Sequence, residues 1–448
     1  MNAGLVERDL SVLWHPCTQM KDHETLPMIP IRRGDGVWLE DMDGNRYIDM
    51  ISSWWVNIFG HTNPRINGAV KDQIDKLEHV IIAGFSHEPV IELSERLVQL
   101  TPGNLSRCFY ADNGSSAIEV ALKMSFHYWR NKGKHKKTRF LSLDNSYHGE
   151  TLGALSVGNV PLYKETYAPL LLDTIIAPSP DCFERPPGVS WEEHSRQRFA
   201  AMEELLAKHA DEVCAVLVEP LVQCAGNMRM YHPIYLSLLR EACDRYGVHL
   251  IADEIAVGFG RTGTMFACEQ ADITPDFMCL SKALTAGYLP LSVTLTHDEI
   301  YNAFYDDYEN LTAFLHSHSF TGNPLGCAAA LATLDIFEED NVIENNKSLS
   351  KLMHELTVDF INHPHVADVR QHGMILAIEM IRDREKREPY PWQERRGLQV
   401  YRHALTRGVL LRPLGNVIYM MPPYVITPEQ IEHVVSVARE GLELATAV

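Results

Sequence analysis

The stretches VHLIADE (248–254) and DFMCLSK (276–282) each place a short apolar run ahead of a polar residue, Asp253 in one and Lys282 in the other. Short runs that are apolar on both faces are typical of parallel strands covered by helices. Three more runs of this kind occur earlier in the chain: RCFYADNG (107–114), RFLSLDNSYHG (139–149) and VCAVLVEP (213–220). The sequence therefore predicts an α/β fold that is built around a mostly parallel sheet.

Amphipathic segments separate these runs. After Ser115, apolar residues recur at helical spacing, and we expect this serine to cap the helix. Residues 194–211 and 233–246 also show helical patterns, whereas the Pro-rich residues 181–191 indicate a surface loop. Residues 36–50 predict two short strands around an Asp-Gly turn, which is a strong hairpin signal.

The length of 448 residues suits two or three folding units. From about residue 336 the pattern changes to a helix, short strands and a Pro-bounded strand at 409–423. We expect a large domain over residues 76–335. The smaller α+β domain would consist of residues 336–448 packed with the N-terminal segment 1–75.

Composition narrows the functional class. Forty Lys and Arg against 59 Asp and Glu give a net charge of −19, which disfavours nucleic acid as a partner. The sequence has no run of eighteen apolar residues, so it does not predict a membrane-spanning helix. The N-terminus does not resemble a secretory signal. The nine cysteines stand singly without a C-x-x-C pair, as in reduced proteins. We expect a cytoplasmic enzyme that binds neither nucleic acid nor membrane.

Polar residues at the carboxyl ends of the predicted strands are the candidates for chemistry, because ligands bind there in open α/β sheets. Taken singly, each has a plain structural explanation: Ser115 as a helix cap, Asp253 as a carboxylate facing water and Lys282 as a solvated lysine. Taken together, they match pyridoxal phosphate, which needs a lysine, a carboxylate for its ring nitrogen, an anion site and a flat group over its ring. These candidates are Gly114, Ser115, Ser116, Tyr147, Asp253 and Lys282.

Competing motifs are weaker. Residues 258–263 (GFGRTG) formally match G-x-G-x-x-G, but no convincing helix follows, so nicotinamide binding is disfavoured. His316, His318 and Cys327 lack further ligands at zinc spacing, and we expect no metal. The sequence contains no G-x-S-x-G elbow and no Walker-type loop.

The segments LIADEIAVGFGRTG (250–263) and LSKALTAG (280–287) resemble the class III, or ω-amino acid, aminotransferases. The resemblance extends over nearly the whole chain. It implies pyridoxal phosphate, fold type I and a seven-stranded type of sheet. Other segments are similar to the branch that aminates 8-amino-7-oxononanoate to 7,8-diaminononanoate in biotin biosynthesis: LWHPCTQM (13–20), MISSWWVNIFGH (50–61), NSYHGETLGALSVG (145–158), EPLVQCAGNMRMYHP (219–233), HSFTGNPLGCAAA (318–330) and LLRPLGNVIYMMPPY (410–424).

The resemblance implies roles around the cofactor. Lys282 would form the Schiff base and shuttle a proton, Asp253 would pair with the pyridine nitrogen, and Tyr147 would stack on the ring. Glu219 would orient the cofactor, or it simply ends its strand. The two subunits of a homodimer would share the phosphate site, to which these residues would contribute: Gly114, Ser115, Ser116 and the partner subunit's Ser319.

The substrate residues also follow from the resemblance. Arg412 would bind the carboxylate of the keto acid, since a planar fork suits that task. Trp54 and Trp55 would form the substrate wall, although both also suit a plain core and Arg412 also suits a surface ion pair. The residues completing the pocket would be Arg261, Tyr419 and Cys17.

Three departures from the family pattern affect the amino donor. Cys17 stands where WHPYT has a tyrosine, Glu150 replaces the aspartate of YHGD, and His318-Ser319 replaces a Pro-Thr pair. We expect S-adenosylmethionine as the donor. Lysine is the alternative, because the stretches at 303–311 and 388–391 resemble a branch that uses lysine.

Two rival interpretations remain open. The first is another ω-aminotransferase acting on ornithine, 4-aminobutyrate or β-alanine. The second is a non-catalytic protein of the same fold, against which the presence of Lys282 and Asp253 argues.

Overall fold

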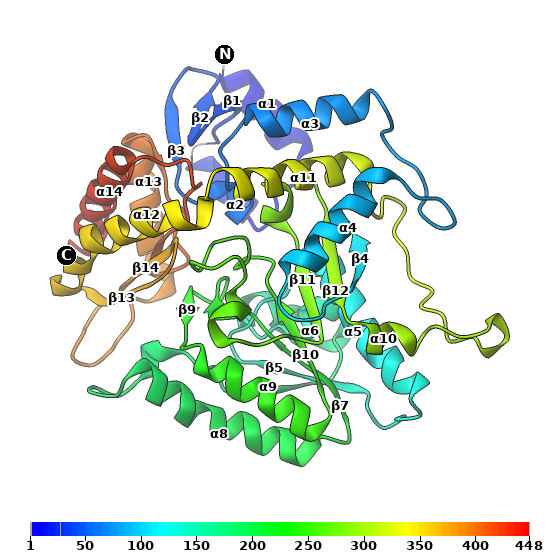
Figure 1. The fold of residues 1–448 in the computed structure, drawn as a ribbon. Helices are drawn as coiled ribbons and strands as arrows, with labels where there is room; N and C mark the ends of the chain where they lie inside the picture. The colour runs from blue at the N-terminus through cyan, green and yellow to red at the C-terminus, as the bar shows by residue number, and fades with distance from the viewer. Residues whose placement is uncertain (1, 27, 448) are drawn as a thin grey trace.

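A computed structural model describes residues 2–26 and 28–447 of the chain (Figure 1). Its largest sheet has seven strands in the order β4-β12-β11-β10-β7-β5-β6. β12 runs antiparallel to both neighbours and the other pairs are parallel, so the expected mostly parallel sheet is confirmed. The strands are β4 (Arg107–Ala111), β5 (Arg139–Leu143), β6 (Thr174–Ala177), β7 (Val213–Val218), β10 (His249–Asp253), β11 (Phe277–Leu280) and β12 (Ser292–Thr296).

Both faces of this sheet are buried, because alternate residues of a strand belong to different cores. In β10, Leu250 and Ala252 share one core with α9 (Ile234–Tyr246), whereas Ile251 belongs to the other core with α5 (Gly114–Asn131). The central strands therefore read as continuous apolar runs in the sequence.

The two expected helices at 194–211 and 233–246 are confirmed as α8 (Trp191–His209) and α9. The five apolar runs are confirmed as strands. The sequence did not identify β6 and β12, which complete the sheet at its edge and inside it.

The expected cap at Ser115 is wrong. The helix α5 begins at Gly114, and the side-chain oxygen of the extended residue Asn113 accepts a hydrogen bond from the Ser116 amide at 3.0 Å. Asparagine is as good a cap as serine, and it satisfies an amide of the first turn. The Ser115 hydroxyl instead accepts a hydrogen bond from the Glu150 amide at 3.3 Å.

The two ends of the chain meet in a second sheet. β2 (Trp38–Asp41) and β3 (Arg46–Asp49) form the expected hairpin, and β15 (Val409–Leu410) pairs in parallel with β3. The N-terminal strands accordingly lie beside the C-terminal helices in Figure 1. β1 (Ile31–Asp35) completes this four-stranded sheet.

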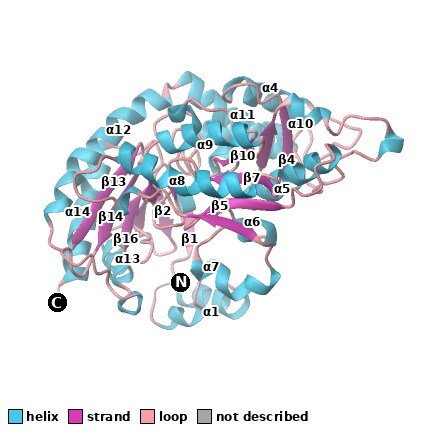
Figure 2. Cartoon of the chain, turned by 90° about the horizontal axis from the view of Figure 1, so that it is seen from below, coloured by secondary structure: helices cyan, strands magenta, loops and turns pink. Residues whose placement is uncertain are grey.

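A third sheet stands apart from the large one (Figure 2). It consists of β13 (Val366–His372), β14 (Ile375–Met380) and β16 (Val417–Met420). The single strand expected at 409–423 is thus two short strands in different sheets, because the chain turns between Leu414 and Val417. The domain limits stay a prediction, and α11 (Pro324–Glu339) runs across the expected boundary at 335.

The remaining elements are helices and two short strands, which pair in a two-stranded antiparallel sheet. They are α1 (Asn2–Val12), α2 (Ser52–Trp55), α3 (Pro64–Ile74), α4 (Glu88–Leu100), α6 (Leu152–Val157), α7 (Pro161–Lys164), β8 (Val222–Gln223), β9 (Arg229–Met230), α10 (Asp298–Asn302), α12 (Val342–Thr357), α13 (Arg396–Thr406) and α14 (Pro428–Thr446). Within the described residues, no helix is long and apolar enough to cross a membrane. All nine cysteines are free thiols. The part of the chain that the structure describes contains no cluster of residues suited to a metal ion.

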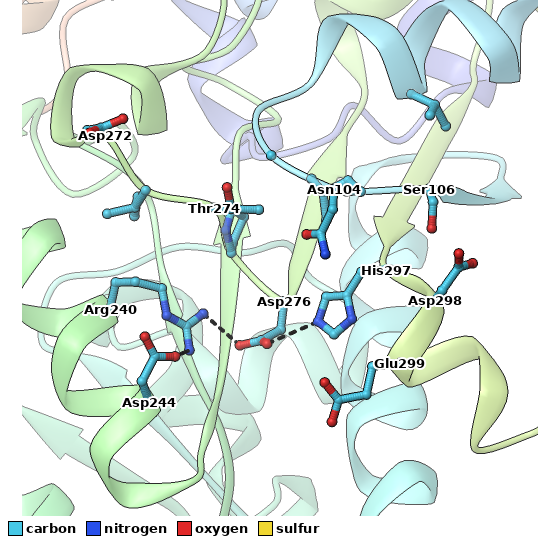
Figure 3. Close-up of a pocket in the computed structure, with 15 residues that line it drawn as sticks. Asn104, Ser106, Arg240, Asp244, Asp272, Thr274, Asp276, His297, Asp298 and Glu299 are labelled. Atoms are coloured by element: carbon cyan, nitrogen blue, oxygen red, sulfur yellow. Dashed lines mark hydrogen bonds and ion pairs between the residues drawn. The ribbon is translucent and has the colours of Figure 1, made fainter.

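Asp276 directly precedes β11 and bonds to the start of β10, so it lies at the opposite end of these strands from Asp253. It borders a cavity of about 570 Å³ (Figure 3), and its carboxylate pairs with Arg240 at 2.8 Å and with His297 at 3.3 Å. It also accepts a hydrogen bond from the Leu250 amide at 2.6 Å. Burial would raise the pKa of Asp276, but the hydrogen bond from His297 and the charge of Arg240 hold this pKa well below its usual range.

We expect Asp276→Asn to lower the free energy of unfolding at pH 7 by about 3 kcal/mol, because it breaks a buried ion pair. A carboxylate with a lowered pKa stabilises the fold above its unfolded pKa of 3.8, and this contribution is lost as the pH falls further. The gap between wild type and variant should therefore narrow below pH 3.8 in urea titrations. Asp272→Asn is the control, since Asp272 borders the same cavity but is exposed. An equal loss in both variants would contradict the prediction.

Candidate active site

A cavity of about 300 Å³ lies where β7, β10 and β11 end. It brings together most of the residues that the sequence predicts around a cofactor. Ser116 and Ser319 lie outside it: the first is buried with its amide held by Asn113, and the second is exposed ahead of α11. The residues lining the cavity are Trp55, Asn113, Gly114, Ser115, Tyr147, His148, Gly149, Glu219, Asp253, Ile255, Ala256, Val257 and Lys282.

Asp253 ends β10 and is paired with a histidine that has the right place in the sequence, after a predicted strand, but was assigned no role from it. His148 donates from Nδ1 to Asp253 Oδ2 at 2.8 Å, and both side chains are buried. Burial alone would lower the pKa of His148, but the hydrogen bond and charge of Asp253, together with the charge of Glu219, raise it. Among the described residues, His148 Nε2 has no hydrogen-bond partner. The only signal in the sequence was its place next to Tyr147.

Glu219 follows β7 and holds the backbone around the cavity. Its carboxylate accepts hydrogen bonds from the amides of Tyr147 and Cys224, each at 2.9 Å. Burial raises the pKa of Glu219 to about 7. It therefore orders the segment that carries Tyr147 and His148, beyond simply ending its strand.

Lys282 begins the turn after β11 in a left-handed conformation, with φ of +47°. Burial lowers the pKa of Lys282, although the charges of Asp253 and Glu219 raise it in part. Its Nζ lies 4.8 Å from the centre of the Trp55 ring. A desolvated lysine has more of the neutral form that attacks carbonyl groups.

The start of α5 forms a compact cradle against residues 149–150. Gly149 has φ of +123°, and a Cβ atom there would lie 2.0 Å from Ser115 Oγ. Only glycine allows this close approach. The first amides of a helix point outward and suit an anion such as a phosphate.

The predicted substrate wall is built on a left-handed turn. Ser52, Ser53, Trp54 and Trp55 have φ of +50°, +46°, +73° and +73°. Each non-glycine residue in such a conformation costs roughly 1–2 kcal/mol. Trp55 is buried and donates from Nε1 to the Tyr419 hydroxyl at 3.2 Å. Trp54 is 41% exposed.

Two arginines predicted to contact substrate lie in different settings. Arg412 stacks over Trp54, with 4.5 Å between its Cζ and the ring centre. Arg261 is fully buried and does not line the cavity. It donates to the carbonyls of Pro422 at 2.6 Å and Trp55 at 3.4 Å, so it supports the wall from beneath.

Cys17 is exposed and belongs to a cluster around Tyr163, which the sequence analysis did not single out. Burial raises the pKa of Tyr163 to about 12, with contributions from Cys17 and Glu150. The Tyr163 ring lies 5.6 Å from that of Tyr147, whose hydroxyl donates to Glu150 at 3.1 Å. The family pattern has a tyrosine at the position of Cys17. In this chain the phenol of Tyr163 lies next to that position.

The family model for aminotransferase class-III matches residues 19–440. The chain belongs to the class III aminotransferases. This class III aminotransferase is 51% identical to the adenosylmethionine-8-amino-7-oxononanoate aminotransferase of Helicobacter pylori, over 97% of this chain and 96% of that protein. It is 46% identical to the protein of the same name from Geobacter sulfurreducens, over 96% and 94% of the two chains.

Solved structures confirm the fold of this class III aminotransferase. The adenosylmethionine-8-amino-7-oxononanoate aminotransferase of Methanocaldococcus jannaschii superposes with a TM-score of 0.94 at 39% identity, over 99% of both chains. An omega transaminase from Pseudomonas jessenii, solved in complex with PMP, has a TM-score of 0.94 at 29% identity, over 99% and 98% of the chains. The expected α/β fold of type I is confirmed.

Class III aminotransferases depend on pyridoxal phosphate, and the residues around this cavity fit that group. The cavity presents the Lys282 amine, the buried Asp253 carboxylate and the helix start at Gly114. These are the partners that an aldehyde, a ring nitrogen and a phosphate require. Gly149 also contributes, because its lack of a side chain lets the backbone lie close to Ser115 at this helix start.

Proposed function

We propose that this chain transfers an amino group to 8-amino-7-oxononanoate, forming 7,8-diaminononanoate for biotin biosynthesis. The Arg412–Trp54 pair carries the proposal. Among the described residues Arg412 forms no ion pair, and a free guanidinium fork suits a carboxylate. The exposed face of Trp54 suits the aliphatic chain of the same substrate. The names of the Helicobacter and Geobacter relatives support this choice.

When bound, pyridoxal phosphate supplies an aldehyde that takes up amino groups and a ring that draws electrons from the reacting carbon. Lys282 would bind the cofactor at its Nζ and would hold and move a proton at the same atom. Asp253, oriented by His148, holds the ring nitrogen in its protonated form. Tyr147 covers the ring, and Glu219 keeps the Tyr147 segment in place.

The helix start at Gly114, Ser115 and Ser116 binds the phosphate in this proposal. Ser319 is exposed, as a residue that serves a neighbouring subunit must be. We infer a homodimer in which the partner subunit's Ser319 completes the phosphate site. The enzyme acts in the cytoplasm, and its partners are small-molecule substrates.

S-adenosylmethionine is the proposed amino donor, in line with the names of the relatives. We expect cofactor-loaded enzyme to lose its cofactor absorbance near the visible range on addition of S-adenosylmethionine and to form 7,8-diaminononanoate, detected by mass spectrometry, when the keto acid follows. Parallel reactions contain lysine as the donor or 2-oxoglutarate as the acceptor. If product forms with lysine and not with S-adenosylmethionine, lysine is the amino donor. A faster reaction with 2-oxoglutarate than with the keto acid would favour a different ω-aminotransferase.

A further inference from the structure

The tryptophan wall rests on a complete left-handed helical turn. Ser53 and Trp54 have ψ of 52° and 46°, which together with their positive φ places both in the left-handed helical region. The Trp55 amide donates to the Ile51 carbonyl at 2.8 Å, and the Val56 amide donates to the Ser52 carbonyl at 3.0 Å. The turn contains no glycine. Such a conformation persists only where its surroundings hold it.

Asp49, the last residue of β3, holds this turn. Its Oδ1 accepts a hydrogen bond from the Ser53 amide at 2.9 Å, and its Oδ2 accepts one from the Ser53 hydroxyl at 2.7 Å. His61 donates to Oδ2 at 3.0 Å and is itself fixed by Asn57 at 2.9 Å. The Asp49 carboxylate is fully buried, so all its contacts are internal.

The C-terminal part of the chain also contacts the turn. The Ser52 hydroxyl donates to the Met421 carbonyl at 2.7 Å, next to β16. The turn therefore connects β3, β16 and the cavity. Its two tryptophans meet different partners, since Trp55 lies over Lys282 and Trp54 lies under Arg412.

We propose that Asp49 is a positioning residue, which sets the substrate wall by stabilising the left-handed turn from Ser52 to Trp55. The inference rests on the proposed function, because the wall is assigned there to the keto acid. Asp49 does not line the cavity and acts only through Ser53 and His61. Without its carboxylate, the Ser53 backbone relaxes to negative φ, and both indole rings leave their places.

Steady-state kinetics of the cofactor-loaded Asp49→Ala variant test the proposal. We expect kcat/KM for 8-amino-7-oxononanoate to fall about 100-fold, as for a group displaced by about 1 Å. The rise in KM should exceed the fall in kcat, because Trp54 and Arg412 bind the chain and carboxylate rather than the reacting carbon. Asp49→Asn keeps one oxygen for the Ser53 amide and should lose only about tenfold.

Glycine at position 53 provides a rescue that a merely structural role of Asp49 would not allow. Glycine adopts positive φ as readily as negative φ, so it needs no carboxylate to hold the turn. In the Asp49→Ala background, Ser53→Gly should restore kcat/KM by about fivefold or more. Absence of any rescue would overturn the proposal.

Hydrogen exchange gives a readout that does not depend on turnover. The amides of residues 52–57 should exchange faster in Asp49→Ala and recover protection in the double variant. Asp41→Ala is the matched control, because Asp41 is also buried but serves the β2–β3 turn through Asn45 and Tyr47. It should lower the melting temperature while leaving residues 52–57 protected and kcat/KM within about twofold.

Two failures are distinguishable. If the wild-type enzyme does not aminate 8-amino-7-oxononanoate, the proposed function fails, and exchange at residues 52–57 still decides the role of Asp49. If the wild type is active but Asp49→Ala keeps its kcat/KM and its protection, the inference about Asp49 fails alone.

Discussion

Lys282→Ala should reduce the turnover of cofactor-loaded enzyme about 10⁴-fold, the upper range for loss of a positioned acid–base group. The cavity offers no substitute amine, since Lys282 is the only lysine among the residues that line it in the described chain. Its burial, which lowers the pKa of Lys282, keeps the amine suited to both bond formation and proton transfer. The measurement is the rate of diaminononanoate formation at saturating substrates.

Covalent labelling provides the second readout for Lys282. Borohydride treatment of cofactor-loaded wild type, followed by peptide mass mapping, should place the label on Lys282. Lys137→Ala is the control, because Lys137 is also buried but does not line the cavity. It donates to the carbonyls of Ala210 and of Val213, which begins β7 at the end opposite the cavity. The control should retain label and turnover. Full activity of Lys282→Ala would contradict the catalytic role.

The fold was predictable where burial on both faces dictates composition. β7, β10 and β11 consist almost wholly of buried residues, and their runs are unmistakable in the sequence. β12 was missed because its SVTLT sequence alternates serine and threonine with apolar residues. The two threonine hydroxyls find partners inside the fold, since Thr294 donates to the Ala117 carbonyl and Thr296 to the Asp276 carbonyl. Local pattern does not report such long-range hydrogen bonds.

The site was predictable for residues whose own functional group suits the expected chemistry, such as an amine or a carboxylate. Lys282, Asp253 and Glu219 meet at one cavity as expected, because parallel strands end at the same edge of the sheet. His148 was given no role and Asp49 was missed, because both act through other residues and only three-dimensional contacts reveal their partners. Arg261 lies near the substrate wall, as expected. Its guanidinium donates to the backbone carbonyls of Pro422 and Trp55 and does not line the cavity.

Asp253→Asn should lower kcat about 10³-fold, in the range for losing one preorganised charge at a reacting centre. Asparagine keeps the size of the side chain and a hydrogen bond to His148, so the cavity should stay intact. It lacks the negative charge that, in the proposed function, keeps the ring nitrogen of the cofactor protonated. The pKa of His148 should fall as well, because burial then acts against the charged ring without the charge of Asp253 to offset it.

Comparison with Asp276→Asn separates catalysis from stability in this last case. Both aspartates are mostly buried and accept a hydrogen bond from a histidine, yet they lie at opposite ends of neighbouring strands. Asp276→Asn should lose stability while retaining kcat, and Asp253→Asn should lose kcat with a smaller change in unfolding free energy. A kcat for Asp253→Asn within about tenfold of wild type would mean that the charge opposite the ring contributes less than one preorganised group normally does.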